Sequence, residues 1–367
     1  AVSGSSRVIH FPKDRSLGKV LIANPHNMSF TVNHETNPWK FAGLAQGKVE
    51  IPANTIARLE VAKEALRDLS PLSKLRPDDL QSLSLAVAEN EYRRYDFDRK
   101  VLPHLGNLTG LQELGMVIDF SAKGLSNIAG LKSLKHLRLT SPRLNNSCME
   151  VLQQLPSLES LSIEADGLTS TGLNHLAKVS SLEELEITGI DIRKIRSSGM
   201  ATLGNLPNLE YLRMHTVNDS IPADYFRFLP ELKSLKVLRL SHFPVPDAGL
   251  EYIAQMKNLE ELNLFTTPVS DTGLAYLATI PSLKKLNIRE YSGHTSNITD
   301  QGMIPIGNIH TLESLELPTT ITDNGLSHLT GLNNLKILKL WNNLNYTDAA
   351  LQHISHFQNL GLCPSRS

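Results

Sequence analysis

The amino-acid sequence predicts an α/β solenoid, in which parallel strands stack on the concave side, helices line the convex side, and a small β-rich domain precedes the repeats. Three observations support this fold class. A strand-like segment recurs at spacings of 23 to 29 residues over most of the chain. A turn and a helix-like segment separate successive strands. The first 62 residues lack this repeat and contain short stretches of alternating apolar and polar residues instead.

The composition excludes several classes of protein. The chain has 367 residues, of which 41% are hydrophobic and 20% are charged, as in folded proteins. A net charge of −1 argues against a globally basic nucleic-acid binder. Two cysteines are too few for a disulfide scaffold, and no run of about 18 apolar residues predicts a membrane span. The small, polar opening at residues 1–6 is typical of the end left by signal-peptide cleavage, so we expect an exported protein, extracellular or at the cell surface.

The elements before the repeats are predicted from apolar alternation. Three segments alternate with a period of about two and are predicted strands: 19–23, 47–51 and 57–61. Residues 1–62 are therefore expected to form a β-rich domain that caps the first repeat, with an independent binding module as the alternative. Residues 63–110 are predicted to be a helical linker and a degenerate first repeat around Leu83.

Residues 111–359 contain about ten repeats of the pattern Leu-x-x-Leu-x-(Leu/Ile/Met). The matches are Leu111/Leu114/Met116, Leu134/Leu137/Leu139, Leu158/Leu161/Ile163, Leu182/Leu185/Ile187, Leu209/Leu212/Met214, Leu235/Leu238/Leu240, Leu259/Leu262/Leu264, Leu283/Leu286/Ile288, Leu312/Leu315/Leu317 and Leu335/Leu338/Leu340. This is the pattern of leucine-rich repeats, each of which buries its apolar side only by stacking on its neighbours. Since burial of one leucine contributes roughly 1.5–3 kcal/mol, this ladder is expected to dominate stability.

The second half of the repeat begins with Asp or Ser and has Gly two residues later. The matches are Asp247-Ala248-Gly249-Leu250, Asp271-Thr272-Gly273-Leu274, Asp300-Gln301-Gly302-Met303, Asp323-Asn324-Gly325-Leu326, Ser170-Thr171-Gly172-Leu173 and Ser197-Ser198-Gly199-Met200. We expect the Asp or Ser to be the helix N-cap, because the oxygen of an N-cap side chain accepts hydrogen bonds from free backbone N–H groups.

The Thr-Asp-x-Gly-Leu unit resembles that of bacterial leucine-rich repeat proteins. The opening at residues 7–18 is similar to the start of large exported repeat proteins from planctomycete-type bacteria. The resemblance implies a leucine-rich repeat fold over residues 100–360 and names no partner. An Asn that many such families place after the strand is largely absent, which argues against the plant-receptor class.

Residues 360–367 are a predicted C-terminal tail without a polar cap, so either the tail or another molecule is expected to cover the last repeat. Cys148 lies about nine repeats from Cys363, which is about 40 Å at roughly 4.8 Å per strand. A disulfide needs Cα atoms within about 7 Å, so the two cannot pair within one chain. Cys363 is therefore a candidate for an intermolecular contact.

No motif for catalysis or for cofactor binding rises above chance. Nucleophile-elbow, zinc-peptidase, P-loop and dinucleotide-binding motifs do not occur. The Ser-x-x-Lys match at residues 282–285 contains the ladder residue Leu283. His353 and His356, with Cys363, have metal-ligating side chains, although an exposed helix face explains the histidines better. We therefore predict no enzyme, no cofactor and no metal site.

Partner-binding residues are predicted on the rim where the strands end. Aromatic residues and arginines, which anchor many interfaces, gather there: Tyr211, Arg213, His215, Arg239, His242, Phe243, Phe265, Arg289, Tyr291 and Trp341. The three longest repeats insert extra residues at this edge, near 190–198, 217–224 and 290–297. Local packing of the long loops is the alternative.

One column of the concave face carries charges in successive repeats: Gln112, Lys135, Glu159, Glu183, Glu210, Lys236, Glu260, Lys284, Glu313 and Lys336. From Lys236 onward the sign alternates, which predicts cross-strand ion pairs. Glu159, Glu183 and Glu210 are like charges in consecutive repeats, joined by Glu184 and Glu186, a pattern that would suit a cationic partner.

These observations favour a non-enzymatic, exported scaffold that mediates protein–protein interaction. The expected partner is a protein ligand or other copies of the chain in a homo-oligomer, with no nucleic acid and no membrane span. A self-assembling structural subunit of an extracellular filament or surface layer is the alternative. A substrate-recognition arm of an intracellular enzyme complex is less favoured, because no docking domain such as an F-box is recognisable.

Overall fold

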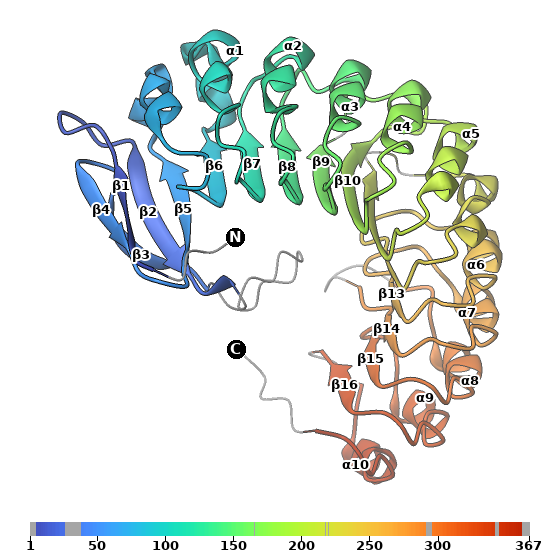
Figure 1. Ribbon diagram of the computed structural model, residues 1–367. Helices are drawn as coiled ribbons and strands as arrows, with labels where there is room; N and C mark the ends of the chain where they lie inside the picture. The colour runs from blue at the N-terminus through green and yellow to red at the C-terminus, as the bar shows by residue number, and fades with distance from the viewer. Residues whose placement is uncertain are drawn as a thin grey trace. The chain divides into compact units, whose positions relative to one another are not determined.

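A computed structural model describes residues 5–25, 38–164, 166–216, 218, 220–290, 296–341 and 345–361. The chain divides into two compact units, unit 1 (Ala1–Glu184) and unit 2 (Leu185–Ser367). In each unit the strands form a sheet, the helices cover one face of it, and the other face is open (Figure 1). This is the leucine-rich repeat solenoid that the ladder predicts.

Unit 1 begins with a group of mostly antiparallel strands. Strand β1 (Arg7–His10) pairs with β4 (Lys48–Ile51), and β2 (Gly18–Ala23) lies between β3 (Lys40–Leu44) and β5 (Ile56–Val61). Strand β5 then pairs in parallel with β6, the first strand of the repeat stack. The β-rich segment thus continues directly into the repeat sheet.

The repeats of unit 1 add parallel strands and short helices. The strands are β6 (Ser82–Ala86), β7 (Glu113–Val117), β8 (His136–Thr140) and β9 (Ser160–Glu164). The α-helices are α1 (Phe97–Lys100), α2 (Ala122–Leu125), α3 (Asn146–Leu152) and α4 (Ser170–Leu176). The 3-10 helices are η2 (Lys63–Arg67), η3 (Ser70–Lys74), η4 (Glu89–Arg94), η5 (Leu102–His104) and η6 (Ser126–Ile128).

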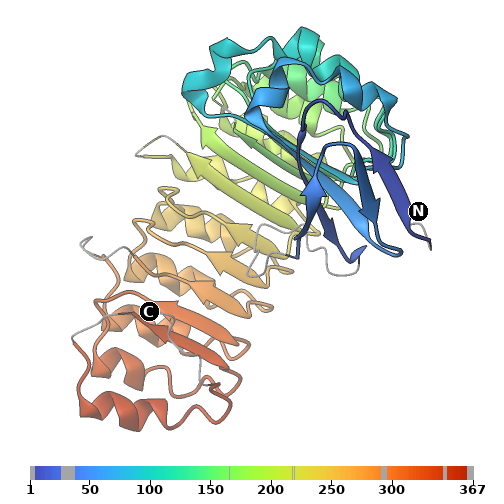
Figure 2. The same cartoon turned by 90° about the vertical axis from the view of Figure 1, so that its left-hand side faces the viewer.

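Unit 2 continues the same strand–helix alternation. Its strands are β10 (Glu184–Ile190), β11 (Tyr211–Thr216), β12 (Val237–Arg239), β13 (Glu261–Asn263), β14 (Lys285–Asn287), β15 (Ser314–Leu317) and β16 (Ile337–Leu340), in sequential order. Its helices are α5 (Ser197–Met200), α6 (Asp247–Ile253), α7 (Asp271–Leu277), α8 (Met303–Ile306), α9 (Asp323–Ser327), α10 (Asp348–Ile354), η7 (Ala201–Asn205), η8 (Ala223–Phe226), η9 (Leu229–Glu231) and η10 (Asp300–Gly302). Figure 2 shows the strands of unit 2 side by side, with the helices on one side of them.

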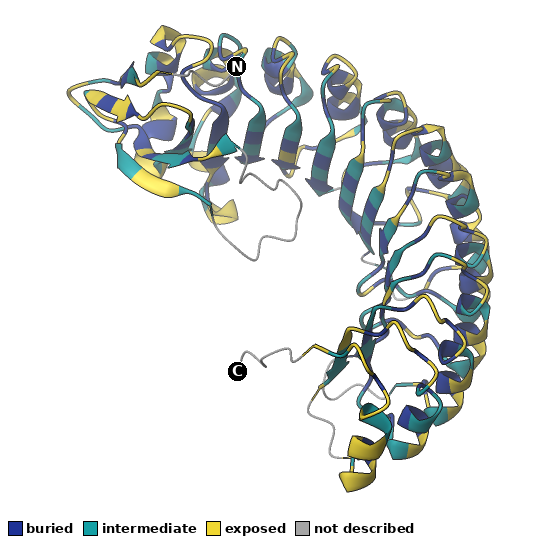
Figure 3. Cartoon of the chain, turned by 60° about the horizontal axis from the view of Figure 1, so that its bottom comes forward, coloured by how far each residue is buried: buried dark blue, intermediate teal, exposed yellow. Residues whose placement is uncertain are grey.

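The register of unit 2 aligns the ladder residues of neighbouring repeats. Leu238 lies opposite Leu262, and Leu262 lies opposite Leu286. Ladder residues up to β15 are at most 2% exposed, whereas Leu338 and Leu340 on β16 are half-buried. Figure 3 shows the buried residues between the strands and the helices. The predicted stacking of parallel strands is confirmed, with Leu238 and Leu262 on adjacent strands.

The prediction that Asp is the helix N-cap is wrong. The cap is the residue before it: the Ser270 hydroxyl accepts a hydrogen bond from the Thr272 N–H at the start of α7, and Thr169, rather than Ser170, caps α4. Asp271 is instead the first residue of α7, and its carboxylate reaches the next repeat. Oδ1 accepts from the Thr299 N–H at 2.8 Å, and Oδ2 accepts from the Thr299 hydroxyl at 2.6 Å.

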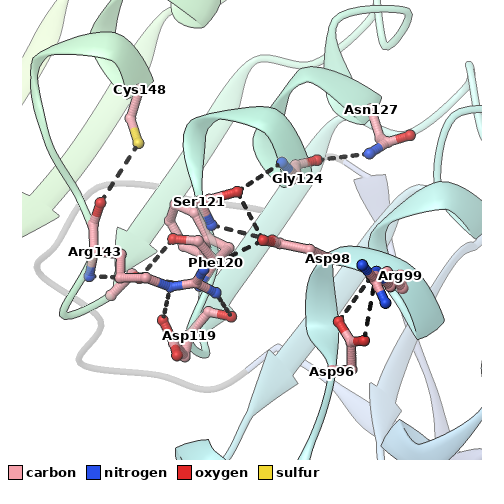
Figure 4. Close-up of polar contacts among 11 residues, drawn as sticks. Asp96, Asp98, Arg99, Asp119, Phe120, Ser121, Gly124, Asn127, Arg143 and Cys148 are labelled. Atoms are coloured by element: carbon pink, nitrogen blue, oxygen red, sulfur yellow. Dashed lines mark hydrogen bonds and ion pairs between the residues drawn. The ribbon is translucent and has the colours of Figure 1, made fainter.

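This Asp–Ser/Thr contact recurs between successive repeats in both units. The pairs are Asp98–Ser121, Asp247–Ser270, Asp271–Thr299, Asp300–Thr322 and Asp323–Thr347, with Asn146–Thr169 as an amide version. Figure 4 shows the first pair, in which the Ser121 hydroxyl also accepts from the Gly124 N–H. Each pair links the start of one helix to the start of the helix in the next repeat. These links stabilise the stack in addition to the leucine ladder.

The glycine of the motif makes room for this carboxylate. A Cβ atom on Gly302 would lie 2.3 Å from Asp271 Oδ1, and one on Gly124 would lie 2.0 Å from Asp98 Oδ1. Both distances are far below van der Waals contact. The Ser/Thr-Asp-x-Gly sequence therefore encodes a cap, a carboxylate for the following repeat, and space for the carboxylate of the preceding one.

Candidate binding surface

The residues proposed for binding lie on the open face of unit 2. On β11, Tyr211, Arg213 and His215 alternate with the fully buried Leu212 and Met214. Since alternate residues of a strand point to the same face, these three share the face that the helices leave open. Parallel pairing then places Arg239 of β12 beside Arg213.

Two asparagines hold the chain just after β13 and β14. The Asn263 side chain accepts hydrogen bonds from the Phe265 N–H at 2.9 Å and from the Ser241 hydroxyl at 3.1 Å. The Asn287 side chain accepts from the Arg289 N–H at 3.0 Å. These bonds fix the backbone from which Phe265 and Arg289 project. These two asparagines were not predicted from the sequence, although Leu-Asn-(Leu/Ile) recurs in both repeats.

Side chains at or just beyond the ends of β11, β12, β13, β14 and β16 form a row. The His215 and His242 rings are 6.2 Å apart, and the His242 and Phe265 rings meet edge to face at 5.3 Å. The Arg289 guanidinium carbon lies 5.5 Å from the Phe265 ring centre and 3.8 Å from that of Trp341. We call the set His215, His242, Phe265, Arg289 and Trp341 the ring row. The fold thus joins residues that are more than a hundred positions apart in sequence.

Tyr211, Arg213 and Arg239 flank the ring row on β11 and β12. The Arg239 guanidinium lies 5.5 Å from the Tyr211 ring centre and pairs with Glu261 at 2.6 Å. Arg213 pairs with Glu186 at 3.0 Å. Both arginines are thereby held in place, and their charges are already matched within the chain.

Burial weakens charge formation at two of these positions. It lowers the pKa of His215, and the nearby His242 and Arg213 lower that pKa further. The ring is therefore neutral at neutral pH. Burial also raises the pKa of Tyr211. No described residue hydrogen-bonds the buried Tyr211 hydroxyl. At neutral pH, His215 and Tyr211 therefore contribute uncharged rings, and the positive charges among the candidate residues come from the arginines.

Phe243, which was expected on the rim, lies in the core instead. It is fully buried, with its ring centre 5.8 Å from that of Phe226 and 6.4 Å from that of Tyr225. Part of the insertion near 217–224 thus leads into local packing, the alternative stated for these loops. Tyr291 lies outside the described residues, as does Cys363.

The charged column is largely neutralised by cross-strand ion pairs. Lysine–glutamate pairs of 2.6 to 2.8 Å join successive repeats: Lys135–Glu159, Lys236–Glu210, Lys284–Glu260 and Lys336–Glu313. The cross-strand ion pairs predicted from the alternating charges after Lys236 are confirmed. Glu159, Glu186 and Glu210 each have a cationic neighbour, whereas Glu183 and Glu184 form no ion pair among the described residues, so a cationic partner of these glutamates stays a prediction.

Chemistry that would indicate an enzyme is not seen among the described residues. They hold no group of three or more His, Cys, Asp or Glu side chains arranged for a metal ion. Cys148 is fully buried on α3, and this burial raises the pKa of its thiol. Among the described residues, no helix is both long and apolar enough to cross a membrane.

Comparison with solved structures finds chains of similar fold. A TLR13–ssRNA13 complex matches with a TM-score of 0.54 and 21% identity, over 83% of this chain and 40% of that chain. An internalin from Listeria monocytogenes matches with a TM-score of 0.45 and 18% identity, over 78% of this chain and 86% of the other. A leucine-rich repeat protein from Leptospira interrogans matches with a TM-score of 0.39 and 19% identity, over 83% of this chain and 81% of that chain.

The chain has the fold of a leucine-rich repeat solenoid. No family model matches it, and no curated protein does. It spans less than half the length of the TLR13 chain. Because the identity is low, the likeness concerns the fold alone.

Proposed function

We propose that the chain is a non-enzymatic scaffold that binds another polypeptide through the ring row of unit 2. The observation that carries this proposal is the row itself: four rings and one guanidinium, each next to the following one, on the open face of the sheet. Such residues supply large contact areas at a small entropic cost, and they dominate the binding energy of many interfaces. The fixed backbone at Asn263 and Asn287 supports the proposal, because a preorganised surface loses little freedom on binding.

Matched alanine substitutions test the proposal. A peptide selected from a display library for binding to the full chain serves as the ligand. Phe265→Ala and Trp341→Ala should each weaken binding by about 2 kcal/mol or more, as expected of interface anchors. Ile304→Ala is the control, because Ile304 is a large apolar side chain that is 45% exposed on α8, away from the open face. If Phe265→Ala and Trp341→Ala bind the peptide as tightly as Ile304→Ala and the unsubstituted chain do, the proposal is contradicted.

Self-assembly through the two edge strands is the second candidate function, with an extracellular filament or surface layer as its form. Among the described residues, six large apolar side chains are exposed, and five of them lie at the two ends of the strand order. Phe41 (61%) and Leu44 (54%) lie on β3, while Ile337 (37%), Trp341 (38%) and Leu351 (66%) belong to the last repeat. Exposed apolar edges favour pairing with another chain.

Sedimentation of the full chain tests this candidate. We expect oligomers that grow with concentration and that disappear in Phe41→Lys or Leu351→Lys. Ile304→Lys, the same change at the sixth exposed position, should leave the oligomers intact. A strictly monomeric chain at high concentration would contradict self-assembly without affecting the binding proposal.

We also propose an extracellular or cell-surface location for the scaffold. The resemblance of residues 7–18 to exported bacterial repeat proteins supports it. Fractionation of cells that express the protein from its own gene tests it. Recovery of the protein in the medium or on the cell surface is expected, and retention in the cytoplasm would contradict it.

A further inference from the structure

Arg289 differs from the other cations on the open face of unit 2. Every other lysine or arginine at a strand or adjoining position from β11 to β16 pairs with a glutamate: Arg213–Glu186, Lys236–Glu210, Arg239–Glu261, Lys284–Glu260, Lys285–Glu261, Lys336–Glu313 and Lys339–Glu316. No described carboxylate lies within ion-pair distance of Arg289, and its buried Nε has no acceptor among the described residues. Arg239 and Lys285 share Glu261, but Arg289 has no carboxylate partner of its own or shared among the described residues.

The two neighbouring rings fix the orientation of this guanidinium. Its central carbon lies 3.8 Å from the Trp341 ring centre, which is stacking distance, and 5.5 Å from that of Phe265. A guanidinium that stacks by its flat face keeps its N–H donors in the plane, directed outward from its edge. That arrangement suits a planar carboxylate, which accepts two parallel hydrogen bonds from one guanidinium.

From these observations we propose that Arg289 binds a single carboxylate of the docked polypeptide, while Phe265 and Trp341 contact the apolar residues on either side of it. The inference rests on the proposed function and adds the chemistry of the partner: an extended segment with one Asp or Glu among apolar residues. A single anionic group is specified, because Arg289 is the one cation of this face that has no carboxylate partner among the described residues. A polyanion such as a nucleic acid would meet Glu210, Glu260 and Glu313 along the same face, with no further unpaired cations in compensation.

The experiment selects peptides of twelve random residues, displayed on phage, for binding to the full chain. The selected peptides should carry one acidic residue between apolar ones. A synthetic peptide and its Glu→Gln or Asp→Asn version are then titrated against the natural chain and Arg289→Gln. Loss of the carboxylate or of the guanidinium should each weaken binding about tenfold or more. Arg289→Gln combined with the amide version of the peptide should weaken binding no more than either change alone, because both changes remove the same interaction.

Two further variants make the result specific. Arg227→Gln is the matched control, because Arg227 is exposed next to η8 in the helical half of its repeat. It should leave affinity unchanged. Arg289→Lys keeps the charge but loses the planar fork, so it should restore only part of the affinity. Circular dichroism and the melting temperature of each variant establish that it folds.

Each outcome decides between the two proposals. Peptides that lose affinity with Phe265→Ala but not with Arg289→Gln overturn the carboxylate and leave the proposed function in place. Peptides that are indifferent to both substitutions overturn both. An oligouridylate of ten nucleotides is titrated in parallel. If it displaces the peptide and depends on Arg289, the partner is not an acidic polypeptide and the inference fails.

Discussion

Replacement of Asp271 by alanine removes one complete link between neighbouring repeats. The Asp271 carboxylate accepts hydrogen bonds of 2.8 and 2.6 Å from the Thr299 N–H and hydroxyl, and it stands at the first position of α7. Because the site is open to solvent, water replaces part of what is lost, so each bond is worth about 1 kcal/mol. We expect Asp271→Ala to lower the free energy of unfolding by about 2 kcal/mol, with a further few tenths lost from the helix dipole.

Asparagine separates the geometry of this link from its charge. Asn146 already forms the amide version in unit 1: its Oδ1 accepts from the Thr169 N–H at 3.0 Å, and its Nδ2 donates to the Thr169 hydroxyl at 2.9 Å. Asp271→Asn should therefore cost about half as much as Asp271→Ala, since both contacts can re-form without the charge. The assay is guanidinium-induced unfolding followed by circular dichroism.

The glycine supplies the second arm of the test. Gly302→Ala places a Cβ atom 2.3 Å from Asp271 Oδ1, which should cost about 1–3 kcal/mol through overpacking. In the Asp271→Ala background the carboxylate is gone and the contact with Leu274 Cδ1 at 3.0 Å remains, so the same substitution should cost less, by about 1 kcal/mol or more. If the two costs simply add, the glycine does not make room for the carboxylate and the explanation of the motif is refuted.

Three further predictions concern the core, a buried histidine and a buried thiol. Leu262→Ala should destabilise the chain by about 2–5 kcal/mol, whereas Ile337→Ala, at a residue 37% exposed, should cost under about 1 kcal/mol; both are measured by guanidinium unfolding. Burial, followed by the charge of Lys135, lowers the pKa of His136 to about 4, below the usual 6.5, so the unfolded chain binds the proton first. The free energy of unfolding should therefore fall as the pH drops from 6.5 towards 4, and His136→Gln should show a shallower fall in urea titrations at pH 7 and 4.5. In a Cys363→Ser variant, Cys148 should react with a thiol reagent only on unfolding, because it is fully buried and its thiol pKa is raised; fast labelling of the folded chain would contradict its place in the core.

The leucine ladder could be predicted from sequence because its period is carried by apolar side chains that neighbouring repeats bury together. Residues such as Leu238 and Leu262 repeat at the spacing of the stack, so local pattern and tertiary register coincide. The role of Asp271 could not be predicted in this way. Its partner, Thr299, is 28 residues away, and an Asp at a helix start fits an N-cap equally well by local rules.

The candidate surface was only partly predictable for a related reason. Phe243 and Phe265 both follow strands of successive repeats, yet Phe243 packs against Phe226 in the core while Phe265 contacts Arg289 on the open face. Sequence alone does not show which way the backbone turns after the strand. The turn contains a left-handed residue in both repeats, His242 and the equivalent Thr266, and Phe265 precedes this residue whereas Phe243 follows it.

Trp341 provides the most direct test of the central claim, that a polypeptide ligand binds the ring row of unit 2. The chain has two tryptophans, so Trp39→Phe leaves Trp341 as the single indole reporter at the end of the row. Addition of a selected peptide should change the Trp341 emission saturably, with the same midpoint as binding measured by calorimetry. Binding that is seen by calorimetry but leaves the Trp341 emission unchanged would show that the ligand lies elsewhere and would contradict the account.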